Sequence, residues 1–323
     1  MMGEKRKKSF VDVVLGSNSM TLFVIWVIVI LVFSVMNANY HTLQNTTNIF
    51  YSATTVGLMA IGETFLIIAG HMDLSISALA AMNGVIVALL IQAGIPWPAA
   101  LLIGLAIGAA VGVVNSALAN VFNIQPFIAT LAVSQICEGV GYILSDGRPI
   151  PIRDRAFISL GTYKIGGIVP IPVLILLAFF IFCGVILKKT TFGRKIYIIG
   201  GNREAAHLAG IDPKKISTVL YILSSLIGAL AGGILAARMH TGQPTACAGA
   251  DLDAITAAIL GGVALSGGKG DMLGCFIGLM IIQCFNTGLS VIGVSSFWQS
   301  VAKGLLLIMA LILDYVRMKR MEQ

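Results

Sequence analysis

The sequence has few charges and no organised set of nucleophiles or metal ligands. Asp, Glu, Lys and Arg make up 11% of its 323 residues, about half the share found in soluble domains. The five cysteines are scattered and none forms a C-x-x-C pair, which argues against a redox or zinc site. The four histidines are too dispersed for a metal cluster, and no Ser-His-Asp or Cys-His arrangement can be drawn. The sequence therefore predicts no metal site, no covalent catalysis and no soluble domain.

What the sequence has in abundance is apolar residues, with 57% hydrophobic composition and a mean hydropathy of +0.94. Apolar runs recur from end to end, and each of the longer ones can cross about 30 Å of hydrocarbon. We expect an all-α membrane protein with about ten transmembrane helices, in one domain at residues 20–316 between tails at 1–19 and 317–323. The eighth run is too short for a straight crossing, so it is re-entrant or broken. The predicted spans are 20–36, 54–69, 76–91, 99–118, 127–144, 167–187, 216–237, 252–265, 272–289 and 296–315.

The net charge of +7 reports membrane sidedness rather than nucleic-acid binding, because the basic residues flank apolar runs. With a cytoplasmic N-terminus, ten spans place most of them on the cytoplasmic side, as the positive-inside rule requires. We therefore expect both termini in the cytoplasm and an uncleaved first span rather than a signal peptide. The two largest basic groups are Lys5, Arg6, Lys7 and Lys8 before the first span, and Lys188, Lys189, Arg194, Lys195, Arg203, Lys214 and Lys215 between the sixth and seventh.

The chain contains a faint internal repeat. Asp73-Leu74 and Asp251-Leu252 open similar stretches, each followed at equal distance by a Gly-Val pair. Chance agreement between apolar helices is the alternative interpretation. Five spans separate the two aspartates, so the copies would be inverted in the membrane, as in many transporters. The Gly-Val pairs are Gly84-Val85 and Gly262-Val263, and two further pairs of motifs follow in the same order: Gly104-x-x-x-Gly108 with Gly274-x-x-x-Gly278, and Asn115-x-x-Leu118 with Asn286-x-x-Leu289.

The segment between the sixth and seventh spans has the pattern of a short capped helix. Asn202 is suited to cap its start and Gly210 to follow its end. Asp212-Pro213 is typical of the cap and first residue of the next span. We expect a two-turn amphipathic helix at about residues 202–210 on the cytoplasmic side. It is either a solvated connection or a docking element for a cytoplasmic partner, and the two caps favour docking.

This segment resembles the coupling loop of ribose-type ABC permeases, the simple-sugar permeases of bacterial binding-protein-dependent importers. The resemblance covers about residues 45–315. The usual Gly-Gly-Ile before Asp-Leu-Ser is replaced here by Gly70-His71-Met72, which adds a bulkier, titratable pair at a presumed gate. The matching motifs are Gly193-Arg194-Lys195-Ile196-Tyr197, Gly200-Gly201-Asn202, Leu208-Ala209-Gly210-Ile211, Asp73-Leu74-Ser75, Pro126-Phe127-Ile128-Ala129-Thr130-Leu131, Gly261-Gly262-Val263, Ser266-Gly267-Gly268-Lys269-Gly270 and Gly293-Val294-Ser295-Ser296.

The resemblance implies a type II ABC importer-like permease in the bacterial inner membrane, which is not itself an enzyme. Its expected partners are a cytoplasmic ABC ATPase that binds ATP-Mg, an extracytoplasmic sugar-binding protein, and a second permease, either an identical copy or a paralogue. This chain would hold no cofactor, because Gly267–Gly270 lacks the first glycine and the hydroxyl residue of a phosphate loop. The implied ATPase-coupling residues are Gly200, Gly201, Asn202, Arg203, Glu204, Ala205, Ala206, Leu208 and Gly210.

The implied cargo is ribose or a similar pentose. A nucleoside, an autoinducer-type sugar derivative or a branched-chain amino acid would fit the same mechanism. Two alternatives use no ATPase: a proton-coupled secondary transporter with Glu63, Glu138 and Lys303 as relay, and a membrane scaffold that transports nothing. The outer loop at residues 145–164 is the expected dock for the binding protein or a solvated loop.

Ionisable residues inside a membrane are costly, so they are expected to face a polar interior. Glu63 and Glu138 lie within predicted spans, and they serve either the substrate path or structural hydrogen bonds. Lys303 near the outer end of the last span either snorkels or pairs with a carboxylate. The predicted path residues are Glu63, Asp73, Asn83, Thr130, Gln135 and Glu138.

Overall fold

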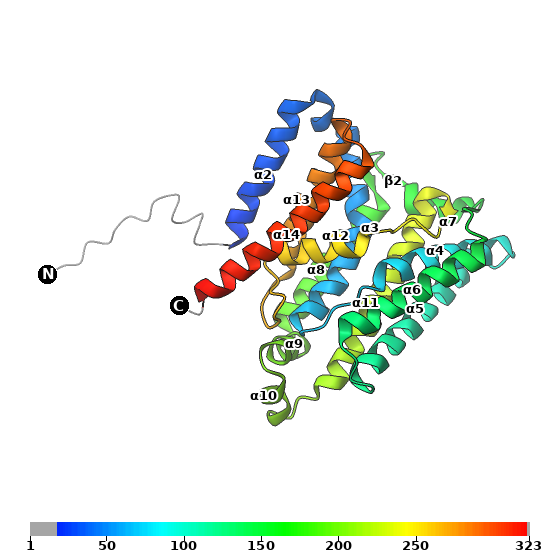
Figure 1. Cartoon of the computed structure of the whole chain (residues 1–323). Coiled ribbons are helices and arrows are strands. Elements are labelled where there is room, and N and C mark those ends of the chain that lie inside the picture. Colours follow the sequence, from blue (N-terminus) through cyan, green and yellow to red (C-terminus); the bar gives the residue numbers. More distant parts are fainter. Residues whose placement is uncertain (1–17, 322–323) are drawn as a thin grey trace.

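The computed structural model describes residues 18–321 and shows a bundle of long helices (Figure 1). Most of the predicted basic tail at 1–19 lies outside this range. Long apolar side chains and intrahelical hydrogen bonding explain why these runs are helical in a membrane. The principal helices are α2 (Asn18–Met36), α3 (Leu43–Ile68), α4 (Ile76–Gln92), α5 (Trp97–Asn120), α6 (Pro126–Ser145), α8 (Ile171–Lys189), α11 (Pro213–Met239), α12 (Ala250–Leu260), α13 (Met272–Val291) and α14 (Ser296–Met321).

Short elements connect these helices at the two ends of the bundle. The helices α9 (Thr191–Gly201) and α10 (Arg203–Leu208) lie at one end, and α7 (Arg155–Thr162) lies at the other (Figure 1). A 3-10 helix, η1 (Ala38–His41), follows α2. Two antiparallel strand pairs complete the described chain: β1 (Ile150–Pro151) with β4 (Thr241–Gly242), and β2 (Lys164–Ile165) with β3 (Val169–Pro170).

Seven helices within residues 18–321 are long and apolar enough to cross a membrane: α3, α5, α6, α8, α11, α13, and α14 as far as Tyr315. Two further apolar stretches are shorter, Met20–Met36 within α2 and Ile76–Gln92, which is α4. The eighth predicted span is the 11-residue α12, too short for a straight crossing as expected. The helical, multi-pass architecture is thus confirmed, while the count of about ten crossings stays a prediction.

The start of the second predicted span differs from the structure. It was predicted at residue 54, but α3 begins at Leu43 because the Thr42 hydroxyl caps it, accepting from the Asn45 amide at 3.3 Å. The last span was predicted at 296–315, and the apolar part of α14 covers Ser296–Tyr315. The helix itself continues to Met321, and the cytoplasmic tail from residue 317 stays a prediction.

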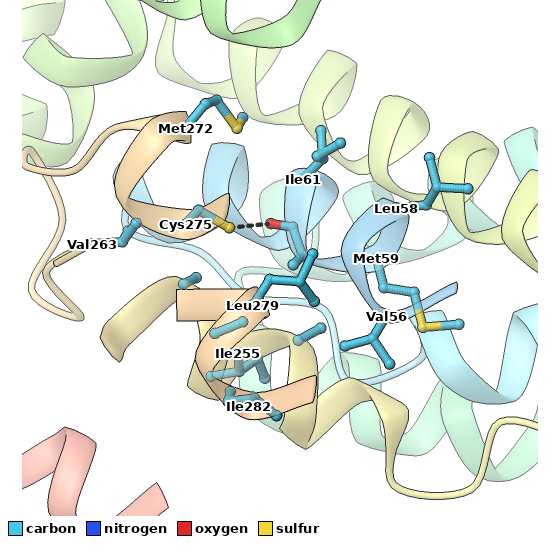
Figure 2. Packing of buried hydrophobic residues seen from close by; sticks show 14 of the residues in the cluster. Val56, Leu58, Met59, Ile61, Ile255, Val263, Met272, Cys275, Leu279 and Ile282 are labelled. Carbon is cyan, nitrogen blue, oxygen red and sulfur yellow. Dashed lines mark hydrogen bonds between the residues drawn. The ribbon is translucent and has the colours of Figure 1, made fainter. Parts of the chain in front are cut away.

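The core lies around α3, whose membrane-length window is 89% buried. Side chains of α3, α12 and α13 interlock there, including Met59, Ile255 and Leu279 (Figure 2). The Cys275 thiol of α13 lies 3.7 Å from the Ala60 carbonyl oxygen of α3. A buried cysteine of this kind acts as a small packing residue.

Glycines allow several pairs of helices to pack closely. A Cβ added at Gly112 of α5 would collide with the backbone of α11, and one at Gly232 of α11 would collide with the Ala80 carbonyl of α4. Gly278 of α13 approaches the Ala257 carbonyl of α12 in the same way. Small residues permit such contacts where lipid supplies no hydrophobic drive for helices to associate.

The two halves of the chain exchange packing partners. The long helix α3 precedes α4 and α5 in sequence but packs against α12 and α13 as well as α11. Conversely, α11 precedes α12 and α13 and packs against α4 and α5. Thus α3 packs against the helices that follow α11, and α11 packs against the helices that follow α3.

Candidate functional site

A non-helical break between α3 and α4, at residues 69–75, is held by buried polar groups. Asp73 is fully buried, and its Oδ1 accepts from the Ser75 amide at 2.8 Å, the Ser75 hydroxyl and the Asn115 side-chain amide at 3.2 Å. The Asp73 amide donates to Glu63 Oε2 at 3.3 Å. The Leu74 amide donates to the Thr130 hydroxyl at 3.1 Å. Side chains of α3, α5 and α6 therefore fix the break.

Several oxygens of this cluster have no hydrogen-bond partner among the described residues. They are Glu63 Oε1, Asp73 Oδ2 and Asn115 Oδ1, all buried. Leaving such an atom unpaired costs about 1–3 kcal/mol. The cluster therefore has the capacity to bind water, a proton or a donor group at the centre of the bundle.

A cavity of about 280 Å³ lies beside the break. Leu74 joins the two, because its amide bonds to Thr130 while the residue also lines the cavity. Gln135 and Glu138 project into this cavity from α6, both exposed, and Asp251 faces it from the start of α12. Amide, carboxylate and hydroxyl groups of this kind suit a ligand rich in hydroxyls.

The predicted path residues thus fall into three places. Glu63, Asp73 and Thr130 form the buried cluster, whereas Gln135 and Glu138 line the adjacent cavity. Asn83 lies elsewhere: it is fully buried against α11, and its amide donates to the Ala229 carbonyl at 2.6 Å.

Sequence reasoning did not place Asp251 in this cavity. The available signal was its match to Asp73 in the predicted repeat: Asp73 lies three residues before α4, and Asp251 is the second residue of α12.

The unusual His71 is anchored rather than free. Its Nδ1 lies 3.3 Å from the Tyr221 hydroxyl of α11, and the two rings meet edge to face at 5.6 Å. Both residues are buried. His71, which replaces the usual glycine, therefore connects the break directly to α11.

Lys303 pairs with a carboxylate, which settles one of its two predicted alternatives. Its Nζ lies 2.7 Å from Asp253 Oδ2, and the Asn286 amide donates to the same oxygen at 3.4 Å. Asp253 faces away from Asp251, because residues two apart on a helix point in nearly opposite directions. The N-terminus of α12 therefore presents one carboxylate to the cavity beside the break and one to α14.

The loop at residues 145–164, predicted to lie outside, contains a helix with a cap of its own. The Asp154 carboxylate accepts from the Phe157 amide at 2.9 Å and starts α7. Gly161 of α7 contacts the backbone of α11 so closely that a Cβ would collide with Arg238. The predicted docking loop is therefore fixed to the end of α11.

The connection between α8 and α11 has the caps that the sequence predicts. The Asn202 side chain accepts from the Ala205 amide at 2.9 Å to start α10, and Gly210 follows α10 with φ of +76°. Asp212 caps α11, accepting from the amides of Lys214 and Lys215. The bond from the Lys215 amide, assisted by that from Lys214 and by the Lys215 charge, lowers the pKa of Asp212.

A second helix in this connection, α9, was missed by sequence reasoning. Thr190 caps it, accepting from the Gly193 amide at 3.1 Å, and Ile196 and Ile199 are buried on one face. That threonine cap and the isoleucine spacing were the available signals.

The helix α9 is seated on two parts of the bundle. The Tyr197 hydroxyl donates to the Gly270 carbonyl at 2.7 Å, and burial raises the pKa of Tyr197, so the hydroxyl keeps its proton. Gly200 lies so close to the Ile68 carbonyl and the Gly268 amide that a Cβ would collide with both. The end of α3 and the loop before α13 therefore meet at α9.

Interrupted helices, a polar interior and an exchanged arrangement of halves define a membrane transporter. A family model described as the permease component of branched-chain amino acid transport systems matches residues 45–311. The chain therefore belongs to this family of permease components, and it falls with the ribose-type permeases of ABC transporters.

Several relatives match across most of their length. A ribose import permease of Bacillus subtilis is 39% identical over 290 residues, which cover 89% of each chain. A ribose import permease of Escherichia coli is 36% identical over 290 residues, covering 89% of this chain and 90% of that protein. An L-arabinose transport system permease of Escherichia coli is 35% identical over 302 residues, covering 92% and 90%. No solved structure matches at a significant level.

Proposed function

We propose that this chain is the transmembrane permease subunit of an ABC importer that moves a ribose-like pentose across the bacterial cytoplasmic membrane. A separate ATPase supplies the work. The observation that carries the proposal is the capped segment α9–α10, which is seated on the bundle at Gly200 and exposes an apolar side chain, Leu208, at 86%. Arg203, Glu204 and Leu208 are all exposed on α10, so a cytoplasmic partner has access to them.

The proposed topology has about ten crossings, with both termini in the cytoplasm. The segment α9–α10 then lies on the cytoplasmic side, and α7 lies outside. The lysines at the end of α8 and the start of α11 support this orientation through the positive-inside rule. The exchanged packing of α3 and α11 supports an inverted internal repeat.

The proposed coupling route begins where the ATPase would contact residues 200–210. Movement of α9 passes to the end of α3 through Gly200 and to the loop before α13 through Tyr197. Both α3 and that loop border breaks in the bundle. The ATPase would thus change the break at Asp73 without touching it.

The proposed sugar path runs through the cavity lined by Gln135, Glu138 and Asp251. Their carboxylate and amide groups accept from and donate to sugar hydroxyls. Gln135 and Glu138 are exposed in the single chain. A second permease copy, identical or paralogous, would close this face, and the binding protein would deliver the sugar at the α7 side.

Uptake in proteoliposomes tests the proposal. The chain is reconstituted with its ATPase, and radiolabelled ribose is supplied with the binding protein. We expect uptake that needs ATP and the binding protein and continues in the presence of a protonophore. Uptake by the purified chain alone, driven by a pH gradient, would instead establish the proton-coupled secondary transporter.

A further inference from the structure

An apolar groove of about 670 Å³ opens between α8 and α13 at the end of the bundle that carries α9. Its walls include Phe180 and Ile181 on α8 and Leu273 and Phe276 on α13. Ile181 and Leu273 are exposed at 69% and 63%. The groove therefore faces the surroundings of the bundle rather than its polar interior.

The wall of the groove that α8 forms ends at a lysine side chain. Leu177, Ile181, Gly184 and Lys188 recur at helical spacing and all line the groove, so one stripe of α8 runs from apolar residues to a lysine. Lys189 also lines the mouth. Both lysines are exposed, and neither forms an ion pair within residues 18–321.

The remaining polar groups at the mouth are engaged by the protein. Asp271 caps α13, its Oδ1 accepting from the Gly274 amide at 2.6 Å. The Tyr197 hydroxyl donates to the Gly270 carbonyl. The two lysines are therefore the groups at the mouth with donors left for a ligand.

We propose that this groove binds an anionic membrane phospholipid, with an acyl chain between α8 and α13 and the phosphate on Lys188 and Lys189. The inference rests on the proposed cytoplasmic position of α9, since the anionic leaflet and basic pockets between helices meet on that side. An apolar slot that ends in paired cations at the membrane boundary matches a phospholipid in both chemistry and order along the membrane normal.

The site has a consequence for coupling. Tyr197 lines the groove and also fixes α9 to the loop before α13. A lipid in the groove packs against that contact and supports α9 when an ATPase acts on the neighbouring residues. ATP-driven uptake therefore depends on anionic lipid.

Native mass spectrometry of the purified full chain tests the binding, with phosphatidylglycerol and phosphatidylethanolamine as probes. The variant K188Q/K189Q is compared with K214Q/K215Q, which removes the same charge from the start of α11. We expect retained phosphatidylglycerol on wild type and K214Q/K215Q, and an affinity about 30-fold lower in K188Q/K189Q, since each lysine near the lipid contributes about fivefold. Equal loss in the two variants, or equal binding of the two lipids, overturns the proposal.

Gly184→Phe tests the apolar part of the site with both lysines in place. A Cβ at Gly184 meets Met272 at an ordinary 3.4 Å, so the ring extends into the groove without a backbone clash. We expect loss of the bound lipid. Retention of the lipid, or a second copy of the chain bound at this face in its place, contradicts the assignment.

Uptake separates this inference from the function on which it rests. ATP-driven uptake that is equally fast in phosphatidylethanolamine alone refutes the lipid's role and leaves the importer standing. Uptake that requires no ATP in any lipid refutes the importer itself.

Discussion

The amide of Gly268 donates to the carbonyl of Ile68 at 2.8 Å, and this bond joins the end of α3 to the loop before α13. Gly200 packs over the same two groups. Three segments far apart in sequence thus meet where α9 contacts the bundle. A force applied to α9 would act on both halves of the proposed repeat at once.

Gly200→Ala tests this junction. The added Cβ would collide with backbone groups at Ile68 and Gly268, which cannot move as a flexible side chain does. We expect normal membrane insertion with ATP-driven uptake reduced at least about tenfold, equivalent to roughly 1.4 kcal/mol of impaired coupling. Gly304→Ala in α14 is the matched control, since nothing lies within 4 Å of its added Cβ. Equal uptake by the two variants would show that the seating of α9 is irrelevant to coupling.

Leu208→Asp tests the exposed face of α10. Leu208 is 86% exposed, so the change leaves the bundle intact while placing a charge where an apolar partner surface is expected. We expect the chain to keep its thermal stability and lose co-purification with the ATPase. Lys215→Ala serves as control, because its surface ion pair with Asp212 contributes little. An unchanged complex with Leu208→Asp would exclude α10 from the interface.

Asp73→Ala tests the break between α3 and α4. The change removes the acceptor of bonds from Ser75 and Asn115 and leaves their donors buried. We expect a loss of about 3 kcal/mol in unfolding free energy and loss of uptake. Asp73→Asn keeps an acceptor oxygen and should be less destabilised. Thermal unfolding in detergent ranks the two, and an alanine variant as stable as wild type would mean that the break is held by other contacts.

A double-mutant cycle measures the link between α12 and α14. We expect Lys303→Gln and Asp253→Asn each to destabilise the chain, and the double variant to recover part of the loss. The coupling free energy should be about 1 kcal/mol, because Lys303 is partly exposed and solvent screens the pair. A coupling free energy indistinguishable from zero would show that the 2.7 Å contact does not stabilise the chain.

Local chemistry was predictable from the sequence, whereas long-range contacts were not. The caps at Asn202 and Asp212 and the residue after the helix, Gly210, are confirmed because each depends on neighbours within a few residues. The pairing of Lys303 was foreseen as an alternative, but its partner Asp253 was not, since that partner is fixed by how α12 packs against α14.

The polar residues show the same difference between what was predictable locally and what depends on long-range packing. Glu63, Asp73 and Thr130 were expected to face a polar interior, and they do meet at one cluster. Asn83 was grouped with them because it is polar within a span, yet α4 turns it toward the Ala229 carbonyl. The sequence identifies which residues avoid lipid, and helix packing decides which of them share a cavity.

The most direct test of the account is the ATP dependence of ribose uptake by wild type and Gly200→Ala in the same proteoliposomes. The liposomes contain the chain, its ATPase and the binding protein, and intact ATPase activity is verified. The account predicts uptake that requires ATP in wild type and falls sharply in the variant while ATP hydrolysis continues. Undiminished ATP-driven uptake by the variant would contradict transmission of work through the contact of α9 with Ile68 and Gly268.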